Sequence, residues 1–244
     1  MSKFLGWLAV VFLISLGFPK NGFADIPDSV MILPKEGFAV AYAPSLLCPL
    51  AVAWDIKKND LTGVKKRPSM SFRTDYYVPA PRAKSRDYVR SGYDRGHLCP
   101  AADRKSSLRR YRATFIMTNV APMCPALNRG PWKRAEQMAR AVAVSGTTVK
   151  IRCGVIHARG SGHVLPNSQV IIPDGFWRLV YTIQPDTMVS CWVFANDSSC
   201  LRAGSGIVPL DSLRHVADSA FLPPFLRAGG RQYSPLIKFN PWRK

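Results

Sequence analysis

The sequence is poor in acidic residues. It has 15 Asp and Glu against 34 Lys and Arg, which gives the 244-residue chain a formal net charge of +19 and a pI of about 10.1. A field of this sign attracts polyanions and raises the rate at which they are encountered. The charge alone still leaves open a basic secreted protein that has no role with nucleic acid.

The chain also lacks internal repeats and low-complexity segments. Apolar residues make up 47% of it and charged residues 20%, a composition that excludes wholesale disorder. Its length is sufficient for one sizeable core. We therefore expect a single globular domain.

Long apolar runs are missing except at the N-terminus. Lys3 precedes an almost wholly apolar run from Phe4 to Phe18, and a small-x-small site follows at Gly22-Phe23-Ala24. The run is too short to span a membrane comfortably, and the pattern is typical of a cleaved signal peptide. We expect residues 1–24 to be that peptide and residues 25–244 to be a secreted or periplasmic domain without stable membrane insertion. An uncleaved anchor is the alternative.

The six cysteines contain no pair of C-x-x-C motifs, which argues against a zinc site. An even number of cysteines in an exported chain predicts disulfides. A Cys99–Cys124 bridge is expected if both segments line one site, and a Cys191–Cys200 bridge is expected across a loop. Buried free thiols are the alternative.

A dense polar cluster lies at residues 93–104, which read Y-D-R-G-H-L-C-P-A-A-D-R. A histidine side chain ordinarily titrates near neutral pH, so His97 is the candidate to take a proton from an attacking water. Arg95 is a permanent planar cation suited to a phosphate. Gly96 lets the backbone turn or approach a ligand closely. Taken alone, the cluster is equally compatible with a surface loop.

A second set of motifs follows in residues 118–140, T-N-V-A-P and then L-N-R-G-P-W-K-R-A-E. With the upstream D-R-G-H-L-x-P-A-A-D, and in this order, they resemble the DNA/RNA non-specific endonuclease family. This family of ββα-metal nucleases includes secreted bacterial enzymes and mitochondrial endonuclease G. Several separate motifs in the right order are more specific than one short motif.

The resemblance implies an α+β fold, with a mostly antiparallel central sheet flanked by helices and a ββα-metal catalytic module. It implies that His97 activates the attacking water, and that Asn119 orients the His97 side chain or neutralises charge around it. Asn128 corresponds to the direct Mg²⁺ ligand and Glu136 to a carboxylate that acts on the ion through water. The residues implied to bind phosphate or stabilise the transition state are arginines: Arg67, Arg95 and Arg140.

The implied ligand set is sparse. One carboxamide and several waters suit Mg²⁺, which keeps much of its hydration shell, and weak retention allows Mn²⁺ to substitute. Since no base-reading element is evident, the expected substrate is DNA and/or RNA cut without sequence specificity. A basic non-catalytic nucleic-acid-binding protein and a toxin or effector nuclease of the same fold are the alternatives.

Hydrophobic periodicity predicts local structure. Residues 25–49 are expected to form an extended arm, and residues 131–144 a helix in which Glu136 and Arg140 share a face. Residues 76–92 interleave tyrosines with basic residues, which suits a nucleic-acid groove, although the tyrosines could equally belong to the core. The expected strands are residues 50–56 with a hairpin turn after them, 114–120 ending near Asn119, 147–153, 170–173, 176–180 and 188–195.

Overall fold

The computed structural model describes residues 29–64, 69–157, 162–184, 186–201, 206–217, 219–227 and 234–235. The expected signal peptide at residues 1–24 and the predicted phosphate ligand Arg67 lie outside these residues. In the described part of the chain, no helix is both long enough and apolar enough to cross a membrane.

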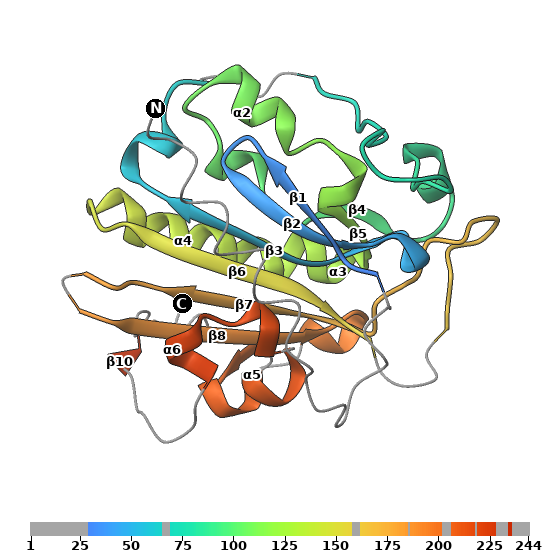
Figure 1. Ribbon diagram of the computed structural model, residues 1–244. Coiled ribbons are helices and arrows are strands. Elements are labelled where there is room, and N and C mark those ends of the chain that lie inside the picture. The colour runs from blue at the N-terminus through green and yellow to red at the C-terminus, as the bar shows by residue number, and fades with distance from the viewer. Residues whose placement is uncertain are drawn as a thin grey trace.

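A central sheet runs through the molecule in the order β1-β2-β3-β6-β7-β8-β10, and β9 also pairs with β8 (Figure 1). All its neighbouring strands are antiparallel except β10, which lies parallel to β8. The predicted α+β fold with a mostly antiparallel sheet is therefore confirmed. The strands are β1 Met31–Lys35, β2 Phe38–Ala43, β3 Cys48–Ile56, β6 Val149–Ile156, β7 Gly175–Tyr181, β8 Met188–Ala195, β9 Gly206–Val208 and β10 Ser234–Pro235.

The N-terminal part of the sheet differs from the expectation. Strands β1 and β2 form a hairpin whose turn contains Gly37 at a φ of +85°, so the predicted extended arm is wrong over residues 31–43. The hairpin predicted after β3 is also wrong. That strand pairs with β2 and β6, and the chain then enters the short 3-10 helix η2 (Lys58–Leu61), where the Asp60 carboxylate accepts the backbone N–H of Lys57 at 2.9 Å.

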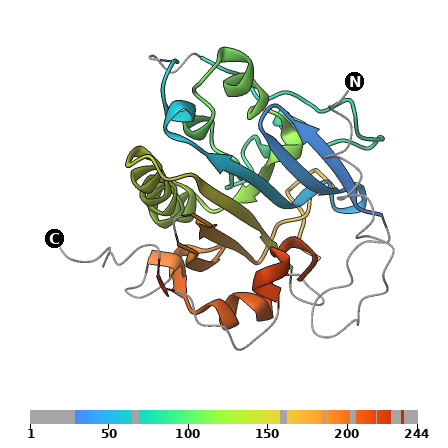
Figure 2. The same cartoon turned by 60° about the vertical axis from the view of Figure 1, so that its left-hand side comes forward.

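Helices cover both faces of the sheet (Figures 1 and 2). On one face, α4 packs through Ala135, Ala139 and Ala143, whose spacing of four residues places them along one side of the helix. On the other face, Leu213 of α5 and Leu226 of α6 pack against β7 and β8. The helices are α2 Leu108–Ala113, α3 Pro125–Leu127, α4 Lys133–Val144, α5 Leu210–Val216 and α6 Pro224–Arg227.

A separate two-stranded sheet lies on the α4 side. Strands β4 (Asp94–His97) and β5 (Val120–Met123) are antiparallel, and α3, the π-helical turn η6 (Asn128–Trp132) and α4 follow β5 along the chain. This is the predicted ββα arrangement. The strand predicted at residues 114–120 is wrong, because residues 117–119 form a 3-10 turn, η5, and β5 begins only after it. The strand predicted at residues 170–173 is a single bridge between Val164 and Ile171.

Gly96 is required by the close packing of these two strands. A Cβ atom at this position would lie 2.6 Å from the Cβ of Met123, a distance too short for any side chain. The residue therefore allows β4 and β5 to come together, whereas the sequence suggested a turn or a close approach to a ligand.

Candidate active site

Asn128 is held by the first residue of β4. Its side-chain amide donates a hydrogen bond to Asp94 Oδ2 at 2.9 Å, and Arg129 donates to both carboxylate oxygens of Asp94 at 2.9 and 2.7 Å. Burial raises the pKa of Asp94, but the hydrogen bonds from Arg129 and Asn128 outweigh burial and hold the pKa below its usual value. The amide nitrogen of Asn128 is bonded to Asp94, and its side-chain carbonyl oxygen is the atom able to bind a cation.

His97 is the last residue of the same strand. Its ring forms a cluster with Phe72 and Phe115: each phenyl centroid is 4.9 Å from the imidazole centroid, and the two phenyl centroids are 5.4 Å apart. Trp132 Nε1 donates to the His97 carbonyl at 3.2 Å. Both ends of β4 are thus bonded to the η6 turn, which brings His97 and Asn128 into one module.

Asn119 lies behind this module and is fully buried. Its amide nitrogen donates to the carbonyls of Cys99 and Thr114 at 2.9 and 3.0 Å, and its carbonyl accepts the backbone N–H of Cys99 at 2.9 Å. Because both amide donors are directed to main-chain atoms, the side chain fixes the backbone that follows His97. These bonds are compatible with the orienting role that the resemblance implies for Asn119, acting through the backbone that follows His97.

The Glu136 carboxylate, on α4, faces two arginine side chains. The Nη1 atom of Arg140 lies 3.7 Å from Oε2, as the spacing of four residues predicts, and the Nη2 atom of Arg178 lies 3.8 Å from Oε1. Burial raises the pKa of Glu136 to about 7, with the cations opposing this shift and the nearby Asp103 carboxylate adding to it. A third cation beside this carboxylate would favour its charged form.

Arg178 is a site residue that the sequence reasoning missed. It is fully buried in β7, and its guanidinium carbon lies 4.4 Å from the ring centroid of Trp132 and 5.4 Å from that of Trp54. The side chain also donates to the Leu98 carbonyl at 3.4 Å. The available signal was a charged residue inside the apolar strand sequence F-W-R-L-V, because a buried charge needs compensation and is often functional.

Arg95 and Arg140, the two predicted phosphate-binding arginines within the described residues, are anchored differently. Arg95 donates from Nε and Nη2 to the Ser85 carbonyl at 3.1 and 2.6 Å, and its guanidinium lies over the rings of Phe72 and Tyr88. Arg140 donates to Asp103 Oδ1 at 2.8 Å, and its side chain keeps 19% exposure. Arg95 therefore shares an aromatic neighbour with His97, whereas Arg140 is tied to a buried carboxylate.

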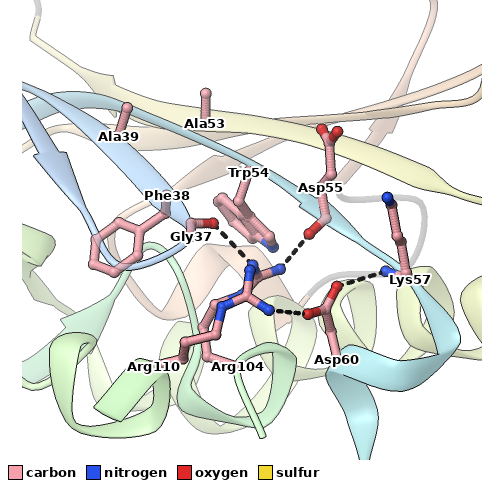
Figure 3. Close-up of a pocket in the computed structure, with 10 residues that line it drawn as sticks. All are labelled: Gly37, Phe38, Ala39, Ala53, Trp54, Asp55, Lys57, Asp60, Arg104 and Arg110. Atoms are coloured by element: carbon pink, nitrogen blue, oxygen red, sulfur yellow. Dashed lines mark hydrogen bonds and ion pairs between the residues drawn. The ribbon is translucent and has the colours of Figure 1, made fainter. Parts of the chain in front are cut away.

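Asp103 and Arg104, at the end of the residue 93–104 cluster, bind the strands of the central sheet. Asp103 is fully buried and accepts a hydrogen bond from Trp54 Nε1 at 3.0 Å. Arg104 binds the Gly37 carbonyl at 2.8 Å and the Asp55 carbonyl, and so joins the motif to β2 and β3. Figure 3 shows this guanidinium in a pocket beside Arg110, which pairs with Asp60. The polar groups in this pocket are largely paired with one another, which is consistent with a structural role.

The predicted disulfides are absent. Cys99, Cys124 and Cys191, all within the described residues, are free thiols. The register of β4 and β5 pairs His97 with Val120 and Asp94 with Met123, so the chain reaches Cys99 and Cys124 beyond opposite ends of this small sheet. Cys191 packs in the core on the α5 side of the central sheet, whereas Cys200 packs in the core on the α4 side. Both expected bridges are therefore wrong.

The fold and this module are those of a ββα nuclease, and comparison with known proteins identifies the family. The sequence profile of the DNA/RNA non-specific endonuclease family matches residues 18–223. Human mitochondrial endonuclease G is 26% identical over 219 residues, covering 84% of this chain and 74% of its own length. A nuclease of Nostoc is 31% identical over 159 residues, covering 64% of this chain and 56% of its own length.

A chain in the crystal structure of the EndoG/EndoGI complex superimposes with a TM-score of 0.69 at 21% identity, covering 84% of this chain and 89% of that one. This likeness supports the fold. The chain belongs to the DNA/RNA non-specific endonuclease family, and it is accordingly a nuclease, an enzyme that hydrolyses phosphodiester bonds.

Proposed function

We propose that the protein is an exported, Mg²⁺-dependent endonuclease that hydrolyses DNA and/or RNA without sequence specificity through a single domain at residues 25–244. The observation that supports this proposal most directly is the pair of bonds at the ends of β4. The Asp94–Asn128 hydrogen bond lies at one end and the Trp132–His97 hydrogen bond at the other. They join a candidate base and a candidate ion ligand on a rigid element.

In the proposed reaction His97 accepts a proton from the water that attacks phosphorus, and the bond between phosphorus and the leaving oxygen breaks. The Phe72 and Phe115 rings restrict the imidazole, which reduces the entropy lost when water and base align. Asn119 fixes the backbone after the base. Arg95 and Arg140 are proposed to stabilise charge on the phosphoryl oxygens with the donors that their anchoring bonds leave available.

The residues fit a hydrated divalent ion. The one oxygen of the Asn128 carboxamide suits an ion that keeps most of its hydration water, and Mg²⁺ favours such a ligand set. Asn128 would be the direct ligand, and Glu136 would accept hydrogen bonds from the ion's hydration water. A bound divalent cation supplies charge neutralisation to the phosphate and the leaving oxygen, and Mn²⁺ is proposed as a substitute.

The substrate is proposed to be bound mainly through its backbone. The net charge is +19 for the full chain and +17 without residues 1–24, which contain Lys3 and Lys20, and it supplies long-range attraction to a polyanion. Arginines are the candidate phosphate ligands, including Arg67, which lies outside the described residues. Contacts of this kind fix the position of a strand without reading its sequence.

A plasmid-nicking assay tests the reaction. Supercoiled plasmid should be nicked and linearised in Mg²⁺, should stay intact when EDTA is added, and should be cut again when excess Mg²⁺ or Mn²⁺ is restored. The physical reason is that Asn128 is neutral and Glu136 is acidic, so neither can supply the positive charge that a divalent cation brings to the phosphate. Cutting that persists at full rate in EDTA would contradict the metal-dependent proposal.

Export requires its own test, since the relatives that were found include mitochondrial enzymes. The proposal predicts that the full chain, expressed in a bacterium, yields a processed protein outside the cytoplasm whose first residue is Asp25. N-terminal sequencing and intact mass of the periplasmic, medium and cytoplasmic fractions provide the measurement. A product that retains Met1 and stays in the cytoplasm contradicts it. A chain with residues 2–24 deleted is the matched control and should remain in the cytoplasm.

A further inference from the structure

Two adjacent tyrosines project from the segment that precedes strand β4. Tyr76 and Tyr77 are 79% and 84% exposed, although most large aromatic side chains in a folded chain bury much of their surface. They lie together in a turn, and the next residue, Val78, is buried at 2% exposure and anchors that turn. The turn therefore presents two aromatic rings to solvent from a fixed backbone.

The turn is tied to the framework of the site by Asp75. This buried carboxylate accepts hydrogen bonds from the backbone N–H of Tyr77 at 3.1 Å, from Lys35 Nζ at 2.6 Å and from Thr118 Oγ1 at 2.7 Å. Thr118 immediately precedes Asn119, so the turn and the residue that fixes the backbone after His97 share one hydrogen-bonded network. Burial raises the pKa of Asp75, but these hydrogen bonds outweigh burial and hold it below its usual value.

A second connection runs along the chain on the other side of Asp75. Arg73 forms a parallel bridge with Ile116, with backbone hydrogen bonds of 2.9 Å to Phe115 and from Met117. Phe115 and Phe72 are the two rings that contact His97. The exposed tyrosines are thus only four and five residues along a bonded segment from a ring that contacts the candidate base.

Each tyrosine ring has a cation beside it. Lys35 Nζ lies 5.4 Å from the centroid of Tyr77, and the guanidinium carbon of Arg82 lies 5.6 Å from that of Tyr76. Arg82 is itself fixed by a 2.6 Å hydrogen bond to the Val78 carbonyl. Exposed basic side chains continue along the segment at Lys84, Arg86 and Arg90. Aromatic faces beside fixed cations are the combination that binds a strand by stacking its bases and contacting its phosphates.

We infer that Tyr76 and Tyr77 form a stacking platform for unpaired bases of single-stranded nucleic acid next to the catalytic module. This inference rests on the proposed function and deepens it, because it names the substrate class that this edge of the site favours. Bases in a duplex are stacked on one another and present no face to the two rings, whereas unpaired bases do. The platform would therefore favour single strands, gaps and melted ends over intact duplex.

Equilibrium binding without cleavage tests the platform. Fluorescence anisotropy is measured in EDTA with the full chain and three labelled probes of equal charge: an oligothymidine, an abasic strand of the same length, and a hairpin duplex with the same number of phosphates. The wild type should bind oligothymidine about tenfold more tightly than the abasic strand, given the usual strength of base–aromatic stacking. Tyr76→Leu/Tyr77→Leu should lose this difference while its affinity for the abasic strand and the duplex stays within about twofold.

Matched variants separate stacking from surface apolarity. Tyr76→Phe/Tyr77→Phe keeps both rings and should keep the preference for oligothymidine, whereas Ile183→Ala removes a different large exposed apolar side chain, 47% exposed, and should change nothing. The single leucine variants provide the same test if the double variant fails to fold, and thermal unfolding checks each protein.

Two results overturn the inference: an equal loss of affinity for all three probes in the leucine variant, or no loss for any of them. Because the probes are bound in EDTA, the outcome does not depend on catalysis. Base-dependent binding without plasmid cutting would contradict the proposed mechanism and support the stacking platform. Plasmid cutting without base-dependent binding would support the nuclease activity and contradict the platform.

Discussion

His97→Ala is expected to lower the rate of plasmid cleavage by about 10²- to 10⁴-fold, the range that general-base catalysis supplies. The alanine variant has no group at the end of β4 able to accept a proton from water. The rate is measured under single-turnover conditions with excess enzyme and saturating Mg²⁺, so that the result reports the chemical step and not substrate affinity.

Two further variants distinguish a lost base from a lost packing contact. His97→Phe keeps an aromatic ring in contact with Phe72 and Phe115 but has no nitrogen, and it should be as inactive as the alanine variant. His215→Ala removes an exposed histidine from α5, which packs on the opposite face of the sheet, and should cut at the wild-type rate. Substantial activity in either the alanine or the phenylalanine variant at position 97 would eliminate His97 as the base.

Asn128→Ala is expected to raise the Mg²⁺ concentration needed for half-maximal cleavage by at least about 10- to 100-fold. That is the range typical of losing a residue that merely supports a ligand, and Asn128 is proposed to be the ligand itself. The measurement is a Mg²⁺ titration of cleavage rate at fixed plasmid concentration. Asn59→Ala, at an exposed position of η2, is the matched control and should titrate like the wild type.

The partner of Asn128 sharpens this test. Asp94→Asn removes the anion that the Asn128 amide and Arg129 both bind, and it should also raise the Mg²⁺ requirement by about 10- to 100-fold while keeping the shape of the side chain. If Asn128→Ala lowers the maximal rate and leaves the Mg²⁺ midpoint unchanged, the ion is bound elsewhere.

The candidate site residues came from the order of the motifs and their resemblance to the family, and the structure joins His97 and Asn128 through β4 and the η6 turn. The amphipathic helix predicted at residues 131–144 has a strong local signal, and the structure places it at Lys133–Val144. The small sheet was harder to place. Residues 114–119 are as apolar as a strand, yet Asn119 directs both amide donors to main-chain carbonyls, and a 3-10 turn results.

What could not be predicted depends on pairing between distant segments. Arg178 follows Asn128 by fifty residues, and only the order of strands in the sheet brings it between Trp54 and Trp132 and opposite Glu136. The cysteine pairs failed for the same reason. Their spacing carried no information about which face of the sheet each thiol would reach, or about the register of β4 against β5.

The buried guanidinium of Arg178 affects the thermal stability that this enzyme can reach. Among the described residues, this charge is compensated by two indole faces, a carbonyl and a carboxylate 3.8 Å away. Such a charge, removed from water, is a thermodynamic liability that well-packed aliphatic side chains would avoid. Selection for heat resistance alone would favour replacing it together with Glu136. We therefore expect a melting temperature below the one that the same fold would reach with aliphatic side chains at these two positions.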